Sequence, residues 1–336
     1  MKSVQSCFFA ACTIILAGFT QMAAAEVTQI RIARQFGLVH LPLMIMEDKK
    51  LIEAAGAKRG LPELKGVFHQ LASTGGINEA LLAGQLDFAP NGGPSLLTIW
   101  DKTRGTSNEV RGLIAVNEFA FFLNVNRPDL KSIRDLTDKD RIVVSAAKVS
   151  VPAILLQMAA QKEWGKENYA RLDKLTVSMA HPDGMAALLS KREVTAHFTS
   201  PPFMHQELEY PGIRKLLSSE DILGGPTVGT ILFGTAKFVQ ANPLATQSLV
   251  DAATEAVNFI NTNKRAAAEV YLRMSKDKSS LDEIVRQISD PSLTFSVVPR
   301  NFMTYARFMH SIGSIKNLPA SWKETFFPNV HDLPGS

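Results

Sequence analysis

The sequence predicts an α/β protein of two lobes, each a mostly parallel sheet flanked by helices. Strand-like segments alternate with helical segments along the chain, which is the pattern of a parallel sheet covered by helices. Two stretches about 108 residues apart also share a framework, which indicates a repeated unit. The 336 residues, 46% of them hydrophobic, exceed what one core usually organises.

The first 25 residues have the pattern of a secretory signal peptide. The basic Lys2 precedes an apolar stretch from Phe8 to Phe19, and small residues stand at Ala23 and Ala25. A membrane span needs roughly 20 apolar residues, so this stretch is too short to span. We expect cleavage near Ala25 and an exported, soluble mature chain.

Both cysteines of the chain, Cys7 and Cys12, lie in this predicted signal peptide. The mature chain would then carry no disulfide and no cysteine-ligated metal, and we expect no cofactor. A lipoprotein cleavage box at Cys12 is an alternative, although Cys12 stands before the apolar stretch ends. Loss of Lys2 leaves 35 of the 36 basic residues against 32 acidic ones. This small excess suits a small anion and is unlike the basic face of a nucleic-acid binder.

The elements of the first half follow one another in a regular order. A strand near Val27 runs into a loop at Gly37, and a helix follows with Pro42 in its first turn and Gly56 after its end. The next segments predict a strand, a helix, and a third strand that ends in a small-residue turn, at 66–70, 77–84 and 85–94.

The second half repeats this order. Gly76 corresponds to Gly184 and Pro94 to Pro202, both at an offset of 108 residues, and Pro42 corresponds to Pro152. Between the repeats, the segments 109–128 and 224–235 are predicted to cross from one lobe to the other, with pivots near Asn117, Glu118 and Thr227. The remainder predicts helices over 242–263, 264–275, 280–289 and 300–315, and a tail that packs across one lobe.

Motifs of catalysis and metal binding are scarce in this sequence. The seven histidines are scattered, and neither a G-x-S-x-G turn nor a G-x-x-x-x-G-K-[ST] loop occurs. One S-x-x-K motif, Ser145 to Lys148, follows a predicted strand instead of opening a helix. A serine hydrolase that uses Ser145 and Lys148 is therefore kept only as an alternative.

Six predicted helices begin directly after strands, three in each lobe. In open α/β sheets such helix starts line one crevice and turn unpaired N–H groups and positive dipole ends toward it. Each dipole contributes roughly 0.3–1 kcal/mol toward an anion. The pattern favours recognition of an anion over its chemical conversion. The starts lie near Leu41, Gly75, Pro94, Val151, Asp183 and Pro202.

Several stretches resemble the periplasmic substrate-binding proteins of ABC importers for nitrate, sulfonate and taurine. They begin at Ile30, Leu71, Arg127 and Leu208, and include Glu79-Ala80-Leu81 with Gly84 and Asp87. The resemblance implies the two-lobed type II fold with the ligand cleft between the lobes. It implies a first lobe of residues 26–117 and 227–336, and a second lobe, 118–226, inserted into it.

The resemblance also implies a pocket, and within it Lys148 and His40 are candidates for charge recognition and Phe36 for an apolar wall. The implied ligand-binding residues are Gln35, Phe36, His40, Leu41, Ser73, Thr74, Gly75, Asn91, Gly92, Gly93, Pro94, Asn117, Lys148, Val149, Ser150, Ser200, Pro201, Pro202 and Thr227.

The function implied is that of a monomeric periplasmic protein without enzymatic activity. It would capture a small anionic solute by hinge closure and deliver it to an ABC permease. The same superfamily includes thiamin-pyrimidine synthases, so an enzyme on this fold is the main alternative. Those enzymes rely on a cysteine-rich motif, which the mature chain would lack.

Overall fold

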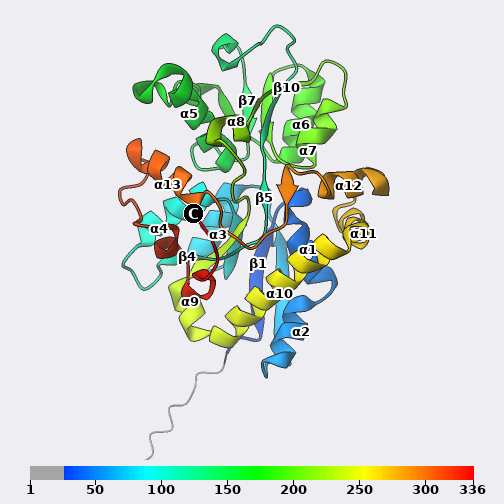
Figure 1. The fold of residues 1–336 in the computed structure, drawn as a ribbon, viewed down its shortest axis with the longest axis vertical. Helices are drawn as coiled ribbons and strands as arrows, with labels where there is room; N and C mark the ends of the chain where they lie inside the picture. Colours follow the sequence, from blue (N-terminus) through cyan, green and yellow to red (C-terminus); the bar gives the residue numbers. More distant parts are fainter. Residues whose placement is uncertain (1–25) are drawn as a thin grey trace, which may run out of the picture.

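The computed structural model describes residues 26–336; the predicted signal peptide lies outside the described residues. The chain forms two five-stranded sheets and a short two-stranded sheet between them. We call the part built on the first sheet the first lobe and the part built on the second sheet the second lobe. Figure 1 shows the second lobe, mostly green, above the first.

The first sheet has the strand order β2-β1-β3-β11-β4. Strands β2, β1 and β3 are parallel, whereas β11 is antiparallel to both β3 and β4. Strand β11 therefore lies between two strands that precede it in sequence by more than a hundred residues. The bounds are Gln29–Arg34 for β1, Lys65–Gln70 for β2, Phe88–Asn91 for β3, Val110–Ala115 for β4 and Ile231–Thr235 for β11.

The second sheet repeats this plan, in the order β10-β6-β9-β7-β8. Strands β8, β7 and β9 are parallel, and β6 is antiparallel to both β9 and β10. Read from the β8 edge, this sheet matches the first sheet read from its β2 edge, as the internal repeat predicts. The bounds are Phe122–Val125 for β6, Ile142–Val144 for β7, Thr176–Ser178 for β8, Ala196–Thr199 for β9 and Arg214–Ser218 for β10.

Two chain segments cross between the lobes and are bonded to each other. Strand β5, Glu118–Phe119, pairs with β12, Leu293–Thr294, and Glu118 also bridges to Val228 of the returning segment. Asn117 is fully buried between the crossings. Its Oδ1 accepts from Thr230 N–H at 2.7 Å, and its Nδ2 donates to the carbonyl of Val39 at 2.5 Å. The pivot region is thus tied to the first lobe.

Six of the eight helices of the repeats begin within two residues of the starts that the sequence predicts. The bounds are Leu41–Asp48 for α1, Leu51–Lys58 for α2, Thr74–Leu82 for α3, Gly93–Thr103 for α4, Val151–Trp164 for α5, His181–Ser190 for α6, Phe203–Leu208 for α7 and Ser219–Leu223 for α8.

The prediction of one helix from Leu41 to Gly56 is wrong in its second half. Lys50 adopts a left-handed conformation, φ 52°, and separates α1 from α2. Gly56 lies inside α2 and does not end it; a Cβ at Gly56 would be 2.9 Å from Leu64, so glycine lets that helix approach the following loop.

The C-terminal part covers the first lobe with helices and an extended tail (Figure 1). The helix bounds are Ala236–Ala241 for α9, Pro243–Thr262 for α10, Lys264–Ser275 for α11, Leu281–Ile288 for α12 and Phe302–Ser311 for α13. The tail packs on β4, where Phe327 N–H donates to the Gly112 carbonyl at 2.8 Å and the Phe326 ring covers Gly112. Of the helices in residues 26–336, none combines the length and the apolar character that a membrane crossing requires.

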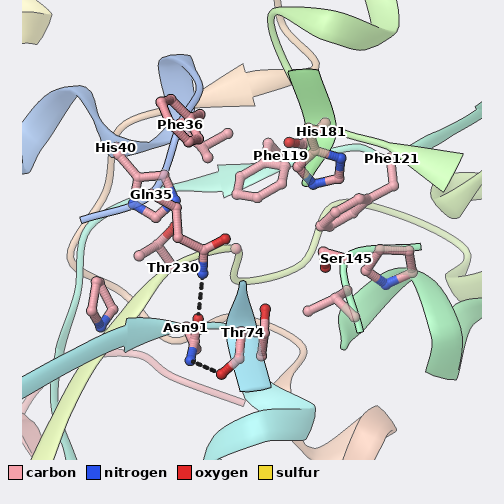
Figure 2. A pocket seen from close by; sticks show the side chains of 17 residues that line it. Gln35, Phe36, His40, Thr74, Asn91, Phe119, Phe121, Ser145, His181 and Thr230 are labelled. Atoms are coloured by element: carbon pink, nitrogen blue, oxygen red, sulfur yellow. Dashed lines mark hydrogen bonds between the residues drawn. The ribbon is translucent and has the colours of Figure 1, made fainter. Parts of the chain in front are cut away.

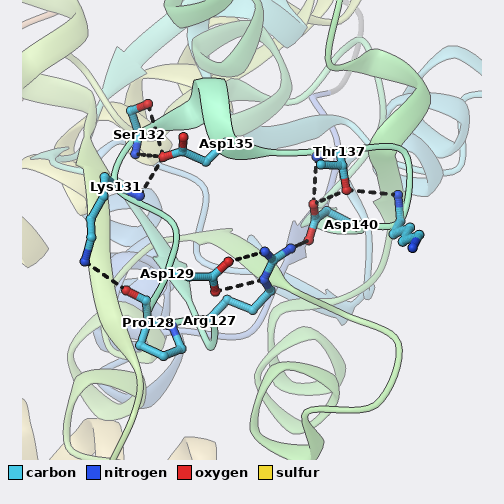
Figure 3. Close-up of polar contacts among 9 residues, drawn as sticks. Arg127, Pro128, Asp129, Lys131, Ser132, Asp135, Thr137 and Asp140 are labelled. Carbon is cyan, nitrogen blue, oxygen red and sulfur yellow. Dashed lines mark hydrogen bonds and ion pairs between the residues drawn. The ribbon is translucent and has the colours of Figure 1, made fainter.

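The segment before β7 is held by polar contacts instead of secondary structure (Figure 3). Arg127 pairs with Asp129 and, at 2.8 Å, with the buried Asp140. Ser132 and Asp135 form a capping box at a short 3₁₀ turn. Burial opposes the charge of Asp140, but hydrogen bonds from Thr137 and Arg127 outweigh it and lower the pKa of this carboxyl. These contacts position the strand that leads to the cavity described next.

Candidate ligand-binding site between the lobes

A cavity lies between the two lobes and is lined from both (Figure 2). It encloses about 50 Å³, less than the roughly 150 Å³ of an engineered cavity that admits benzene. In this conformation it suits only a small solute. Its lining consists of Gln35, Phe36, Val39, His40, Thr74, Pro90, Asn91, Gly92, Phe119, Phe121, Ser145, Val151, Pro152, His181, Ser200, Gly229 and Thr230.

Five helices begin at this cavity. His40 and Gly92 are the N-cap residues of α1 and α4, and Thr74, Val151 and His181 are the first residues of α3, α5 and α6. Three of these helices come from the first lobe and two from the second. Their positive ends face the same small volume, which favours negative charge there.

On the first-lobe side, a hydrogen-bonded pair of amides forms part of the cavity wall (Figure 2). Asn91 Nδ2 donates to the Thr74 carbonyl at 3.4 Å and to Asn78 Oδ1 at 2.8 Å. Asn91 Oδ1 accepts from Gln35 Nε2 at 2.8 Å. Since a main-chain carbonyl can only accept, these bonds fix both amide orientations and leave the Oε1 of Gln35 for a ligand.

On the second-lobe side, His181 is the cavity-facing end of a buried polar chain. Its Nδ1 lies 3.0 Å from His197 Nε2 and 3.1 Å from the Thr199 hydroxyl. The Nδ1 of His197 lies 2.5 Å from Glu207 Oε1, and both His197 and Glu207 are fully buried. Asn124 Nδ2 donates to the other carboxylate oxygen at 2.9 Å.

Aromatic rings supply the apolar part of the wall. Phe119 and Phe121 come from the first crossing segment and pack against each other with ring centroids 4.8 Å apart. Phe36 follows β1 and is 41% exposed, so it stands at the mouth of the cavity (Figure 2). A ligand would therefore meet apolar surface beside the hydrogen-bonding groups.

The lining carries no charged side chain at neutral pH. Burial, with a further contribution from Arg34, lowers the pKa of His40 to about 3. Burial and the neighbouring His197 and His40 hold the pKa of His181 well below its ordinary value. Both imidazoles are thus neutral, so a role of His40 in recognising a charged ligand, which stays a prediction, would use hydrogen bonding and no positive charge of its own. His40 Nδ1 is buried without a partner in the described residues.

The structure brings seven of the predicted site residues to the cavity: Gln35, Phe36, His40, Thr74, Asn91, Gly92 and Ser200. The other twelve do not line it. Asn117 lies in the crossing, Ser73 caps α3, and Pro201 accepts a hydrogen bond from Leu38 N–H at 3.2 Å. Lys148 is exposed. The remaining eight are Leu41, Gly75, Gly93, Pro94, Val149, Ser150, Pro202 and Thr227.

Ten of the residues that line the cavity were not predicted from the sequence to bind the ligand. One of these ten could have been predicted. The repeat offset of 108 places His181 opposite Ser73, so the alignment of the repeats could have identified it. Ser145 entered only as a candidate nucleophile; it lines the cavity, but the Lys148 of its motif does not. The others are Val39, Pro90, Phe119, Phe121, Val151, Pro152, Gly229 and Thr230.

The fold matches those of known two-lobed binding proteins. An alkanesulfonate-binding protein, SsuA, from Xanthomonas axonopodis pv. citri, solved with bound MOPS, has a TM-score of 0.66 at 16% identity, with 88% of this chain and 96% of that chain covered. The periplasmic nitrate-binding protein NrtA of Synechocystis PCC 6803 has a TM-score of 0.68 at 17% identity, with 89% and 84% covered. The aliphatic sulphonate-binding protein SsuA of Escherichia coli has a TM-score of 0.64 at 16% identity, with 90% and 92% covered.

These similarities define the class: the chain has the two-lobed fold of the periplasmic binding proteins. None of the curated proteins matches the chain in sequence. The model of the NMT1-like family matches residues 23–275, which is most of the chain. The protein belongs to the NMT1-like family.

Proposed function

We propose that this protein is a solute-binding protein of an ABC importer, which closes its lobes around one small solute and presents the closed form to a permease. The observation that carries the proposal is the cavity itself, enclosed by residues of both lobes and of both crossing segments. Similarity in fold to sulfonate- and nitrate-binding proteins supports the same function. Under this proposal the chain acts in the periplasm as a monomer, after removal of residues 1–25.

Contacts across the cavity support hinge closure as the mode of capture. Leu38 N–H of the first lobe donates to the Pro201 carbonyl of the second at 3.2 Å. Gly92 of the first lobe lies against Val151 of the second. A ligand that touches both lobes stabilises this closed arrangement by its differential affinity for it.

The ligand class that we propose is a small anion. The five helix starts supply positive potential without a charged side chain, and the cavity size excludes large solutes. Fold neighbours that bind sulfonate and nitrate support this class. The aromatic rings at the wall and mouth suit a short organic anion as well as an inorganic one.

The test is ligand-dependent stabilisation of the purified mature chain by nitrate, taurine, short alkanesulfonates and short carboxylates. A ligand that binds only the folded state raises unfolding free energy by about 2.7 kcal/mol at a hundred times its Kd. We expect one such anion to raise Tm, to bind with a stoichiometry of one, and to be recovered unchanged. Conversion of the bound compound would contradict the proposal and favour an enzyme on this fold.

A further inference from the structure

The buried chain from Glu207 to His181 decides which hydrogen-bonding role the cavity offers a ligand on the second-lobe side. A neutral imidazole has one N–H and one lone pair, so the bond made by one nitrogen fixes the role of the other. Nδ1 of His181 is used inside the second lobe. Nε2 has no hydrogen-bond partner among the described residues, and it is the nitrogen left for a ligand.

Glu207 determines the direction of each hydrogen bond in the series that links Glu207, His197 and His181. A carboxylate only accepts, so His197 donates its Nδ1–H to Glu207 across 2.5 Å. As long as His197 carries no second proton, its Nε2 is an acceptor, and His181 donates its Nδ1–H to it across 3.0 Å. The Thr199 hydroxyl, 3.1 Å from the same Nδ1, can either donate or accept, so it is compatible with Nδ1 of His181 as donor or as acceptor. Nε2 of His181 thus meets the cavity with a lone pair.

One added proton reverses the hydrogen bond between the two histidines. If a proton binds His181 Nε2, the Nδ1 proton of His181 can pass to His197 Nε2. His197 becomes an imidazolium paired with the Glu207 carboxylate, and His181 stays neutral but now offers Nε2–H as a donor. The net charge of the buried Glu207–His197 pair thereby changes from −1 to zero.

An anion in the cavity drives this change. Nitrate and sulfonates carry only acceptors, so they cannot hydrogen-bond to a lone pair on His181 Nε2 and are repelled by it. They also add a second negative charge near the buried Glu207 carboxylate. The titratable groups that adjoin His197 are His181 of α6 and Glu207 of α7, and His40 lies across the cavity from His181. Asn124 of β6 and Val143 of β7, which also adjoin this chain, carry no charge.

We propose that His181 determines the ligand specificity of this cavity, and that the Glu207–His197 pair holds it in the Nδ1–H tautomer until an acceptor-only anion binds together with one proton. That the ligand is an anion rests on the proposed function. That a proton binds with it rests on the hydrogen bonds that link Glu207, His197 and His181. A ligand with its own N–H or O–H donor at this position would bind without proton uptake.

The first experiment needs no ligand. Nitrogen-15 NMR of histidine-labelled protein at pH 8, assigned with H181Q and H197Q, reports the tautomer of each ring. We expect His181 and His197 both protonated at Nδ1 and unprotonated at Nε2. A His181 protonated at Nε2 in the ligand-free protein would overturn the proposal, whatever the ligand proves to be.

The second experiment measures the proton directly. Titration calorimetry with nitrate or ethanesulfonate is run at pH 8 in Tris and in triethanolamine, two cationic buffers that differ in ionisation enthalpy and do not compete as anions. We expect uptake of about one proton per anion, and a Kd that rises with pH by up to about tenfold per pH unit. Binding with the same enthalpy in both buffers would overturn the proposal.

Variants separate this role from a structural one. H197Q and E207Q are each expected to abolish proton uptake, and E207Q keeps the shape of the side chain that packs beside His197. H310Q is the matched control, since His310 is exposed and outside the cavity. If E207Q binds the anion with the wild-type proton uptake, the proposal fails. If the wild type binds none of the anions, the proposed ligand class fails, and the NMR result still decides the tautomer.

Discussion

At the scale of single residues, Gly92 marks a close approach of the two lobes at the cavity. A Cβ at this position would lie 2.1 Å from Val151 Cγ2, which is closer than any real contact. The backbone of Gly92, φ −81° and ψ 170°, is one that alanine adopts without strain. The glycine is therefore required by the closure of the lobes and not by the local fold.

Gly92→Ala is expected to impair closure. Because Val151 is β-branched and stiff, overpacking would cost about 1–3 kcal/mol, so ligand affinity falls by roughly 5- to 150-fold while the free protein keeps its Tm. Calorimetry and thermal unfolding of the ligand-free protein measure the two effects. Gly75→Ala is the matched control, since a Cβ there meets nothing within 4 Å. The G92A/V151A double variant should regain affinity; an unaffected G92A would mean that the lobes do not close as described.

His40 couples stability to pH. Its pKa is lowered to about 3 by burial and Arg34, against about 6.5 in an unfolded chain. Between these values the unfolded state binds a proton that the folded state refuses, so stability falls as pH decreases from 6.5 toward 3. The loss approaches about 1.4 kcal/mol per pH unit. His40→Gln is expected to flatten this dependence in denaturant unfolding from pH 4 to 7, and an unchanged slope would place the titration elsewhere.

Individual site residues could be predicted from the sequence only where they follow a predicted strand or have a counterpart in the internal repeat. Asn91 and Gly92 follow a predicted strand, and both line the cavity. Lys148 follows β7, a predicted strand of the second lobe, but its backbone is left-handed, φ 67°, and its side chain is exposed. Whether a loop side chain turns toward a cleft depends on such dihedral angles, which a pattern of residue types does not contain.

At the scale of elements, the C-terminal tail completes the first lobe. Phe326 is fully buried, and its ring packs edge-on against Phe302 and Trp322 with centroids 5.4 Å away in each case. It also fills the space over Gly112 of β4. The tail is therefore part of the core of this lobe.

Phe326→Ala is expected to lower the free energy of unfolding by about 3–5 kcal/mol, the usual cost of removing a buried aromatic ring. Denaturant unfolding measures it, with Leu318→Ala as the control because Leu318 is 45% exposed in the same tail. The control should cost less than about 0.5 kcal/mol. Equal effects of the two substitutions would show that Phe326 is not packed as described.

Most elements could be predicted from sequence because their signals are local. Prolines in the first turn marked α1, α4, α5 and α6. The break between α1 and α2 left no such mark, because Lys50 has no preference for the left-handed region that it occupies. Tertiary packing, which brings Gly56 against Leu64, overrides the local signal there.

At the scale of the whole molecule, a contact far from the cavity joins the lobes. Gln206 Nε2 of α7 donates to Ser279 Oγ at 3.0 Å and lies 3.3 Å from Asp277 Oδ2, both between α11 and α12. Under the proposed hinge closure, these bonds form only when the lobes are closed, and they would then stabilise the closed state alone.

Gln206→Ala is expected to shift the population toward the open form. Loss of the bond to the Ser279 hydroxyl, about 0.5–1.5 kcal/mol, and of the long bond to the Asp277 carboxylate, about 1.5 kcal/mol, would weaken ligand binding by roughly 30- to 150-fold. Small-angle scattering and calorimetry report the shape and the affinity, and Gln85→Ala serves as the control because Gln85 is exposed in the first lobe. Unchanged affinity in Q206A would remove this contact from the energetics of closure.

The position of β11 sets an order of folding. This strand fills the slot between β3 and β4, yet it is reached only after the complete second sheet, whose strands span residues 122–218. If the chain emerges from a membrane N-terminus first, as an exported protein would, the second lobe has all its strands while the first still lacks β11. Pulsed hydrogen exchange during refolding should therefore show protection of β7 and β9 before β3 and β4. The long delay before β11 pairs would keep the first lobe loose, and so threadable through a translocation pore, until most of the chain has crossed.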